Sequence, residues 1–209
     1  MGEIKIEKLV LGMVETNCYY IYDEDNREAV VVDPAKEGLY SKLSEKGITI
    51  KAIILTHGHF DHILGINDIK ENCENVKVYA FKEEADLLKD PQLNASWDIR
   101  RPCSINADVL LEDKEEFSLC GIDFKVIATP GHTAGSCCYY MPKQKWLISG
   151  DTLFEGSVGR SDLPTGDERK IIESVRMLID GLEGDVAVYP GHGPETTIGR
   201  ERSCNPFYS

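Results

Sequence analysis

Three histidines and an aspartate crowd into six consecutive positions of this 209-residue chain, where residues 56–62 read THGHFDH. The four side chains are His57, His59, Asp61 and His62. Imidazole nitrogens and carboxylate oxygens are the ligands that Zn²⁺ and similar first-row metals prefer. A protein core accommodates so many histidines poorly, because each ring nitrogen needs a hydrogen-bond partner. The stretch therefore predicts a metal site.

The remaining two of the five histidines, His132 and His192, each follow a Pro-Gly dipeptide, and Asp151 follows Gly150. Alone, each of these is an ordinary turn. All three come after apolar runs that predict strands, and glycine lets the backbone bend sharply where a side chain must be aimed. Rigid strands that end in short turns can direct their ligands to one point. We therefore expect the three side chains to join the cluster at 57–62.

Five histidines and two aspartates make seven candidate ligands, and one metal ion normally takes three or four. Seven ligands fit two divalent ions that share one carboxylate. Two such ions about 3.5–4 Å apart can polarise a carbonyl or phosphoryl oxygen, and they lower the pKa of bound water to about 7. The residues thus predict a hydrolytic centre, and Zn²⁺, Fe and Mn²⁺ all accept these ligands.

The elements that must position these side chains are apolar runs separated by polar or glycine-containing turns. Strands are expected at 4–10, 18–22, 29–32, 50–55, 76–80, 117–119, 123–128, 136–141, 145–149 and 186–189. Helices are expected at 39–46, from Asp61 as a candidate cap, at 82–89, and after a capping box at 165–168. This alternation predicts mixed sheets covered by helices. Residues 90–107 show no period and are a lid or a connecting loop.

Composition limits the setting and the partners. The net charge of -13 opposes binding to nucleic acid or to an anionic membrane. No apolar run approaches the ~18 residues that span a membrane, and the N-terminus lacks a signal-peptide pattern. Seven cysteines without a CxxC spacing favour reduced thiols. We expect a cytoplasmic protein with one domain over residues 1–209, and the sequence does not indicate its oligomeric state.

The stretch at 56–62 resembles the HxHxDH signature of the metallo-β-lactamase superfamily, and the order of His132, Asp151 and His192 matches its later ligand motifs. The resemblance covers essentially the whole chain and implies an α+β fold, the four-layer αββα sandwich. Residues 129–133 (TPGHT), 150–154 (GDTLF) and 156–162 (GSVGRSD) resemble the glyoxalase II, or hydroxyacylglutathione hydrolase, group. Residues 196–202 and 205–207 resemble its short bacterial branch.

Carried over to this chain, the resemblance implies a specific ligand set. The first metal would be held by His57, His59 and His132, the second by Asp61, His62 and His192, and Asp151 would bridge them. Zinc is the expected metal, with iron or manganese as alternatives. The implied reaction is hydrolysis of a small-molecule thioester such as S-lactoylglutathione by a metal-bridging hydroxide, with Asp61 as a catalytic residue that orients it. Asp33 and Thr133 are either partners of the ligands or ordinary turn residues.

The substrate-binding residue that the resemblance implies is Arg160, which falls where the group places a basic glutathione-binding residue. The tyrosine expected two positions later is Asp162, and the branch lacks the C-terminal helical domain that supplies other glutathione contacts. Arg160 would bind a substrate carboxylate, with Arg100 or Arg101 as alternatives. Each of these arginines could instead form a surface ion pair.

Other functions share the same residue pattern. A persulfide dioxygenase of the superfamily uses a single iron, and a lactonase or other ester hydrolase uses a similar metal centre. A module that binds metal without catalysis is a further alternative. Nuclease members act on anionic polymers, which the acidic composition disfavours.

Overall fold

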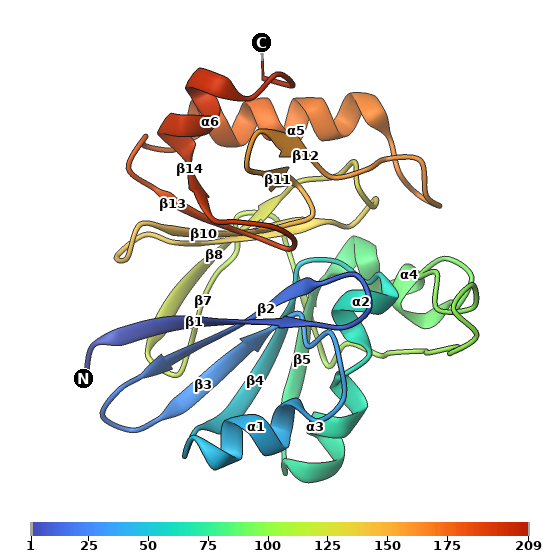
Figure 1. The fold of residues 1–209 in the computed structure, drawn as a ribbon, viewed down its shortest axis with the longest axis vertical. Coiled ribbons are helices and arrows are strands. Elements are labelled where there is room, and N and C mark those ends of the chain that lie inside the picture. The colour runs from blue at the N-terminus through green and yellow to red at the C-terminus, as the bar shows by residue number, and fades with distance from the viewer. Residues whose placement is uncertain (1, 209) are drawn as a thin grey trace.

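Two six-stranded sheets face each other in the middle of the molecule, and helices cover both outer faces (Figure 1). The computed structural model describes residues 2–208. The four layers confirm the αββα sandwich that the resemblance implied. No helix among the described residues has the length and apolar character needed to cross a membrane.

The first sheet has the order β1-β2-β3-β4-β5-β6. Its strands are β1 (Ile4–Leu11), β2 (Thr16–Asp23), β3 (Glu28–Val32), β4 (Thr49–Leu55), β5 (Lys77–Phe81) and β6 (Val109–Leu111). The first three strands pair antiparallel, and β3 to β6 pair in parallel. Helices α1 (Leu39–Glu45) and α3 (Ile66–Asn72) cover its outer face at the bottom of Figure 1. Parallel pairing places the carboxyl ends of β3, β4 and β5 at one edge of the sheet.

The second sheet has the order β14-β13-β10-β9-β8-β7. Its strands are β7 (Glu116–Leu119), β8 (Ile122–Ala128), β9 (Cys137–Met141), β10 (Trp146–Gly150), β13 (Ala187–Pro190) and β14 (Thr196–Thr197). A small hairpin, β11 (Leu153–Phe154) and β12 (Ser157–Val158), follows β10. Helices α5 (Glu168–Gly181) and α6 (Ile198–Cys204) cover the outer face at the top of Figure 1.

The core has three apolar layers, one between the sheets and one beneath each pair of helices. Phe124 and Tyr139 are among the largest side chains between the sheets. Adjacent residues in a strand point to opposite faces, and this places Cys137 between the sheets and Cys138 under α5. All seven cysteines are free thiols, as predicted. Burial of each large apolar side chain stabilises the fold by about 1.5–3 kcal/mol.

The helix predicted from Asp61 is two short helices, α2 (Phe60–Ile63) and α3. Gly65 separates them, because the chain after β3 passes against it: its N–H donates to Pro34 O at 2.7 Å. His59 is the N-cap of α2, so the predicted capping role of Asp61 is wrong. The segment predicted as one helix at 82–89 starts with a 3-10 turn, η1 (Lys82–Glu84), and continues as α4 (Ala85–Lys89).

The N-cap of α5 is Asp167, whose carboxylate accepts the N–H groups of Arg169 and Lys170. The predicted capping box that begins at Thr165 is therefore wrong. Thr165 has a positive φ of 70° and its hydroxyl accepts the N–H of Ala134 instead. The sequence reasoning also missed β6, β11, β12, β14 and α6, which are short elements.

Residues 90–107 contain turns but no helix or strand. The buried Asn94 anchors them: its side-chain amide donates to Leu88 O and Cys103 O, and its backbone carbonyl accepts the N–H of Phe60 at 2.9 Å. The segment is a connecting loop fastened to α2 and α4, and Ala95 forms part of a pocket wall described below.

Candidate metal centre

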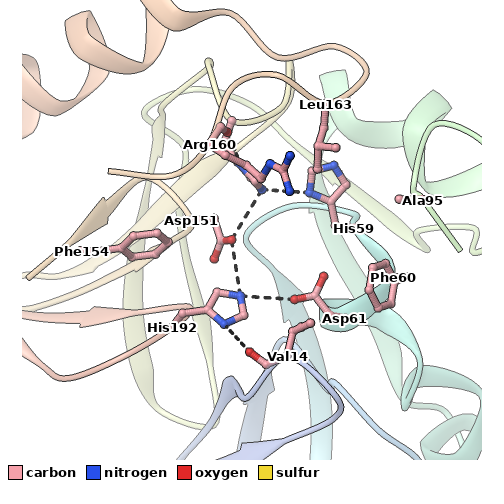
Figure 2. A pocket seen from close by; sticks show the side chains of 11 residues that line it. Val14, His59, Phe60, Asp61, Ala95, Asp151, Phe154, Arg160, Leu163 and His192 are labelled. Atoms are coloured by element: carbon pink, nitrogen blue, oxygen red, sulfur yellow. Dashed lines mark hydrogen bonds and ion pairs between the residues drawn. The ribbon is translucent and has the colours of Figure 1, made fainter. Parts of the chain in front are cut away.

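All seven predicted ligand side chains follow strand ends and come together at one edge of the sandwich. The turn after β4 carries His57 and His59, and helix α2, which follows directly, carries Asp61 and His62. The turns after β8, β10 and β13 carry His132, Asp151 and His192. The first sheet thus supplies four of the side chains and the second sheet three. Figure 2 shows Asp61, Asp151 and His192 pointing toward one another.

Glycine is required in two of these turns, as the sequence suggested. Gly131 has a φ of 139°, and a Cβ atom there would lie 2.2 Å from the backbone nitrogen of Ile171. A Cβ atom on Gly191 would lie 2.1 Å from Asp151 Oδ1. The Pro-Gly turns therefore allow an approach that any other residue would block.

The first group consists of His57, His59 and His132, all of them buried. His132 Nε2 lies 2.8 Å from His59 Nδ1 and 3.2 Å from His57 Nε2. Burial and the neighbouring imidazoles lower the pKa of His57 well below its usual value and that of His59 to about 3. Both rings are therefore neutral near pH 7, and their lone pairs are available to a cation.

The second group consists of Asp61, His62 and His192. Asp61 Oδ2 lies 3.4 Å from His62 Nε2 and 3.3 Å from His192 Nε2. Burial acts to lower the pKa of His62, but the nearby carboxylates raise it well above its usual value. Burial acts to raise the pKa of Asp61, but His62 and His192 hold it well below its usual value. The carboxylates of this half of the centre thus favour a positive charge beside them, which a bound cation would supply.

Asp151 lies between the two groups. Its Oδ2 is 3.6 Å from His132 Nε2 and 3.5 Å from His192 Nε2, and its Oδ1 is 3.5 Å from His62 Nε2. One carboxylate therefore faces side chains of both groups, which is the geometry that a shared ligand needs.

The chemistry of these atoms fits metal ions. Among the described residues, the buried atoms His59 Nε2, His62 Nε2 and Asp151 Oδ1 have no hydrogen-bond partner. A buried polar atom without a partner costs about 1–3 kcal/mol. Three sets of ligand atoms, each within 4.8 Å of one another, could each hold an ion. These sets are His57, His59 and His132; His57, His62 and Asp151; and Asp61, His62 and His192.

Backbone carbonyls orient two of the rings from outside. His132 Nδ1 lies 2.6 Å from Arg160 O, and His192 Nδ1 lies 3.1 Å from Val14 O. A carbonyl only accepts hydrogen bonds, so each Nδ1 carries the proton and each Nε2 presents its lone pair to the centre.

Asp33, at the end of β3, orients two further rings. Its carboxylate accepts from Thr56 N at 2.9 Å, from Thr56 Oγ1 at 2.6 Å and from His62 Nδ1 at 3.0 Å. The Thr56 hydroxyl, having donated to Asp33, can accept from His57 Nδ1 at 3.2 Å. Asp33 is therefore a direct partner of a candidate ligand.

Thr133 is not such a partner. Its hydroxyl donates to Glu84 at 2.9 Å, its N–H donates to Ser136 Oγ, and it contacts none of the seven ligands through a hydrogen bond. The tight turn after His132 directs its side chain away from the centre, toward η1.

Two residues at the start of β2 support the centre and were missed. Thr16 Oγ1 donates to Asp61 Oδ2 at 2.9 Å. Asn17 Nδ2 donates to Pro190 O and Gly193 O, both at 2.9 Å, and so fixes the turn that carries His192. In the sequence, a Thr-Asn pair before an apolar strand resembles an ordinary turn. Its supporting role is visible only from its hydrogen bonds to residues distant in the chain.

A cavity of about 370 Å³ opens over the two groups (Figure 2). Its apolar lining consists of Val14, Phe60, Ala95, Phe154 and Leu163. Arg160 also lines it, and its guanidinium binds the Asp162 carboxylate through two hydrogen bonds of 2.7 Å. Arg101 pairs with Glu37 and, like Arg100, does not line this cavity.

Comparison with known proteins decides the family, because the sequence profile of the metallo-beta-lactamase superfamily matches residues 11–192. The chain belongs to the metallo-beta-lactamase superfamily. Hydroxyacylglutathione hydrolase GloC of Haemophilus influenzae is 32% identical over 212 residues, which cover 98% of each chain.

Two solved structures resemble the chain closely. The B3 metallo-beta-lactamase BLEG-1 has a TM-score of 0.92 and 38% identity, and the match covers 98% of this chain and 100% of that one. TTHA1623 in a di-iron-bound form has a TM-score of 0.84 and 33% identity, covering 96% and 99%. Membership and these matches identify the protein as a metallo-hydrolase of this superfamily.

Proposed function

We propose that this protein hydrolyses thioesters with a small acyl group, such as S-lactoylglutathione, at a centre of two divalent metal ions. The observation that carries the proposal is the meeting of two ligand groups around one shared carboxylate, Asp151. The similarity to GloC supports the thioester as substrate class. Zinc suits the nitrogen and oxygen ligands, and the di-iron form of TTHA1623 makes iron the main alternative.

We keep the division of the ligands that the resemblance implied. One ion would be held by His57, His59 and His132, and the other by Asp61, His62 and His192. Asp151 would reach both. When bound, the ions would polarise the substrate carbonyl and lower the pKa of a water molecule to about 7.

Asp61 would orient the attacking water. Its pKa lies well below the usual range, because His62 and His192 stabilise the charged form against the opposing effect of burial. The carboxylate therefore accepts hydrogen bonds at neutral pH, and Thr16 holds Oδ2 in place. Water would add to the carbonyl carbon and release one proton to solvent, the carbon–sulfur bond would break, and the sulfur would leave as thiolate while the carboxylic acid forms.

The cavity walls would hold the substrate. Phe60, Phe154 and Leu163 supply apolar surface beside the centre and reduce its access to bulk water. Arg160 at the rim would bind a carboxylate of the thiol half, in competition with Asp162. Exposed pairs of this kind are worth only about 0.2–1 kcal/mol, so a substrate carboxylate can replace Asp162.

The setting proposed for this activity is the cytoplasm, where the seven free thiols would stay reduced. A small-molecule thioester is the only partner that the proposal requires. The acidic charge remains our reason to expect no nucleic-acid or membrane partner.

The test combines metal analysis with an assay of thiol release from S-lactoylglutathione. We expect two metal ions per chain and thiol release, with kcat about 100-fold or more lower in Asp61→Asn at metal concentrations that saturate both of its sites. Asp98→Asn, an exposed substitution on the 90–107 loop, is the control and should match the wild type.

Three results would overturn the proposal. One iron per chain with oxygen uptake on glutathione persulfide would indicate a dioxygenase. Turnover of lactones or oxygen esters without thioester hydrolysis would indicate a different hydrolase. Two bound ions without turnover of thioesters, lactones, oxygen esters or glutathione persulfide would indicate a module that binds metal without catalysis.

A further inference from the structure

Glu84, the last residue of η1, is a buried carboxylate that the proposed reaction does not use. Its side chain is 1% exposed. Oε1 accepts the N–H of Gly58 at 2.7 Å, and Oε2 accepts the N–H of Gly135 at 3.0 Å and the hydroxyl of Thr133 at 2.9 Å. Within residues 2–208, no lysine, arginine or histidine forms an ion pair with it.

The three donors belong to two different ligand turns. Gly58 separates His57 from His59 in the turn after β4, which extends the first sheet. Thr133 follows His132 in the turn after β8, which extends the second sheet. One oxygen of Glu84 therefore binds the first turn and the other oxygen binds the second. The carboxylate spans the two sheets directly behind the first ligand group.

The packing leaves little freedom around this link. A Cβ atom on Gly135 would lie 2.2 Å from the backbone nitrogen of Glu84, and one on Gly58 would lie 2.7 Å from a methyl group of Leu87. Both turns thus approach η1 and α4 as closely as glycine permits. Neither turn can shift toward η1 and α4 without a clash, and the hydrogen bonds oppose movement away.

The hydrogen bonds require a carboxylate and not merely a polar side chain. All three partners donate, and they divide between both oxygens. Glutamine has one accepting oxygen, and its NH₂ group would face a donor on one of the two turns. Burial raises the pKa of Glu84 to about 7, which shows that the environment disfavours the charge.

We propose that Glu84 is a positioning residue for the first metal ion: it holds the turn of His57 and His59 and the turn of His132 at the separation that one ion requires. The inference rests on the metal centre of the proposed function but not on the identity of the substrate. It assigns Glu84 no contact with substrate or with metal.

The structure supplies a matched control in Glu201 of α6. This carboxylate is 0% exposed and also accepts from three side-chain or backbone donors: Gly156 N at 2.8 Å, Thr196 Oγ1 at 2.6 Å and Asn205 Nδ2 at 2.9 Å. None of these donors lies in a ligand turn next to a candidate ligand. A purely structural role for Glu84 predicts that Glu84→Gln and Glu201→Gln behave alike.

The experiment measures binding of Zn²⁺ to the metal-free protein by competition with a chromophoric chelator, together with thermal unfolding of the metal-free protein. We expect Glu84→Gln to weaken one of two Zn²⁺ sites by about 10–100-fold and to change the other by less than about threefold. Glu201→Gln should lower Tm of the metal-free protein but leave both affinities within about threefold of wild type.

Equal Zn²⁺ affinities in Glu84→Gln and wild type would overturn the inference. If Glu84→Gln does not fold, Thr133→Val serves as a second variant, because it removes one of the three hydrogen bonds that Glu84 accepts. We expect Thr133→Val to weaken the first Zn²⁺ site by about 3–10-fold. Unchanged Zn²⁺ affinity in Thr133→Val would equally overturn the inference. A wild type that binds two Zn²⁺ but hydrolyses no thioester would contradict the proposed function and leave this test intact.

Discussion

Asp33→Asn should weaken the second metal group without touching a ligand. Asp33 has a φ of 49°, in the left-handed region, which asparagine also adopts readily. The substitution thus leaves the backbone unstrained and replaces one accepting oxygen with an NH₂ group. At the Oδ2 position that group would face both His62 Nδ1 and the Thr56 hydroxyl, whose bonds to Asp33 measure 3.0 Å and 2.6 Å. At the Oδ1 position it would face the backbone N–H of Thr56, which cannot accept a hydrogen bond.

The threonine hydroxyl can rotate and accept, but the imidazole has no such freedom. His62 can avoid the new donor only by moving its proton from Nδ1 to Nε2, the atom that faces Asp61 and Asp151. The ligand lone pair is then lost. Changes to such supporting partners typically weaken metal affinity 10–100-fold, which corresponds to about 1.4–2.8 kcal/mol at 1.4 kcal/mol per tenfold.

The assay is the same chelator competition with Zn²⁺, with Asp98→Asn as an exposed control. We expect one site to weaken 10–100-fold in Asp33→Asn, and we expect lower thermal stability of the metal-free protein, because a buried donor loses its partner at a cost of about 1–3 kcal/mol. A folded Asp33→Asn protein with wild-type affinity at both sites would refute the reasoning that Asp33 sets the proton position of His62.

Of three further predictions, two concern residues around the centre and one concerns a hydrogen-bond network far from it. Thr16→Val removes the 2.9 Å donor to Asp61. Because a hydrogen bond to a charged group is worth about 1.5 kcal/mol, kcat should fall about tenfold with little change in KM, and Thr16→Ser should restore kcat. Unchanged kcat in Thr16→Val would contradict this role of Thr16. Asp162→Asn removes the charged partner of Arg160, so KM for S-lactoylglutathione should fall about 2–5-fold. KM for a thioester of an uncharged thiol should not change. Equal effects on both substrates would argue against recognition by Arg160. The pKa of Glu7 is lowered to about 2, chiefly by its hydrogen bond from Tyr20. The contribution of Glu7 to the stability of the fold is therefore complete above the unfolded pKa near 4.5 and is lost as pH falls from there toward 2. Wild type should therefore lose up to about 1 kcal/mol more unfolding free energy than Glu7→Gln between pH 5 and pH 2, and parallel pH profiles in denaturant titrations would contradict this.

The sequence was sufficient to predict the ligands because their types are chemically specific and their positions follow apolar runs. His57, His59 and His62 could not all be satisfied core residues, and the Pro-Gly turns before His132 and His192 indicated sharp bends at strand ends. The strands of the central sheets were predicted to within a few residues for the same reason: a buried strand is a short apolar run with turn residues on either side.

The supporting contacts could not be predicted, because each joins residues that are distant in the chain. Thr16 binds Asp61 across 45 positions, and Glu84 binds Gly135 across 51. No local period marks such pairs. The sequence left two roles open for Asp33, a partner of the ligands or an ordinary turn residue, because its three hydrogen bonds form only when β3 and β4 pair.

The elements that were missed are short, and tertiary contacts decide them. β6 and β14 have three and two residues and exist because an adjacent strand pairs with them. The cap of α5 shows a related problem. Thr165 and Asp167 are both good N-cap residues, and the choice between them depends on the bond from Ala134 to the Thr165 hydroxyl.

Because the ligands are divided between the two sheets, bound metal ions would link the sheets at the edge of the sandwich where these side chains meet. The four side chains at 57–62 and the three between His132 and His192 meet only when both sheets are assembled. Ions that bind this assembled form, and not the unfolded chain, stabilise it by mass action, at about 1.4 kcal/mol for each tenfold excess of free metal over the dissociation constant. The lifetime of the folded protein in a cell, as well as its activity, would therefore follow the supply of metal.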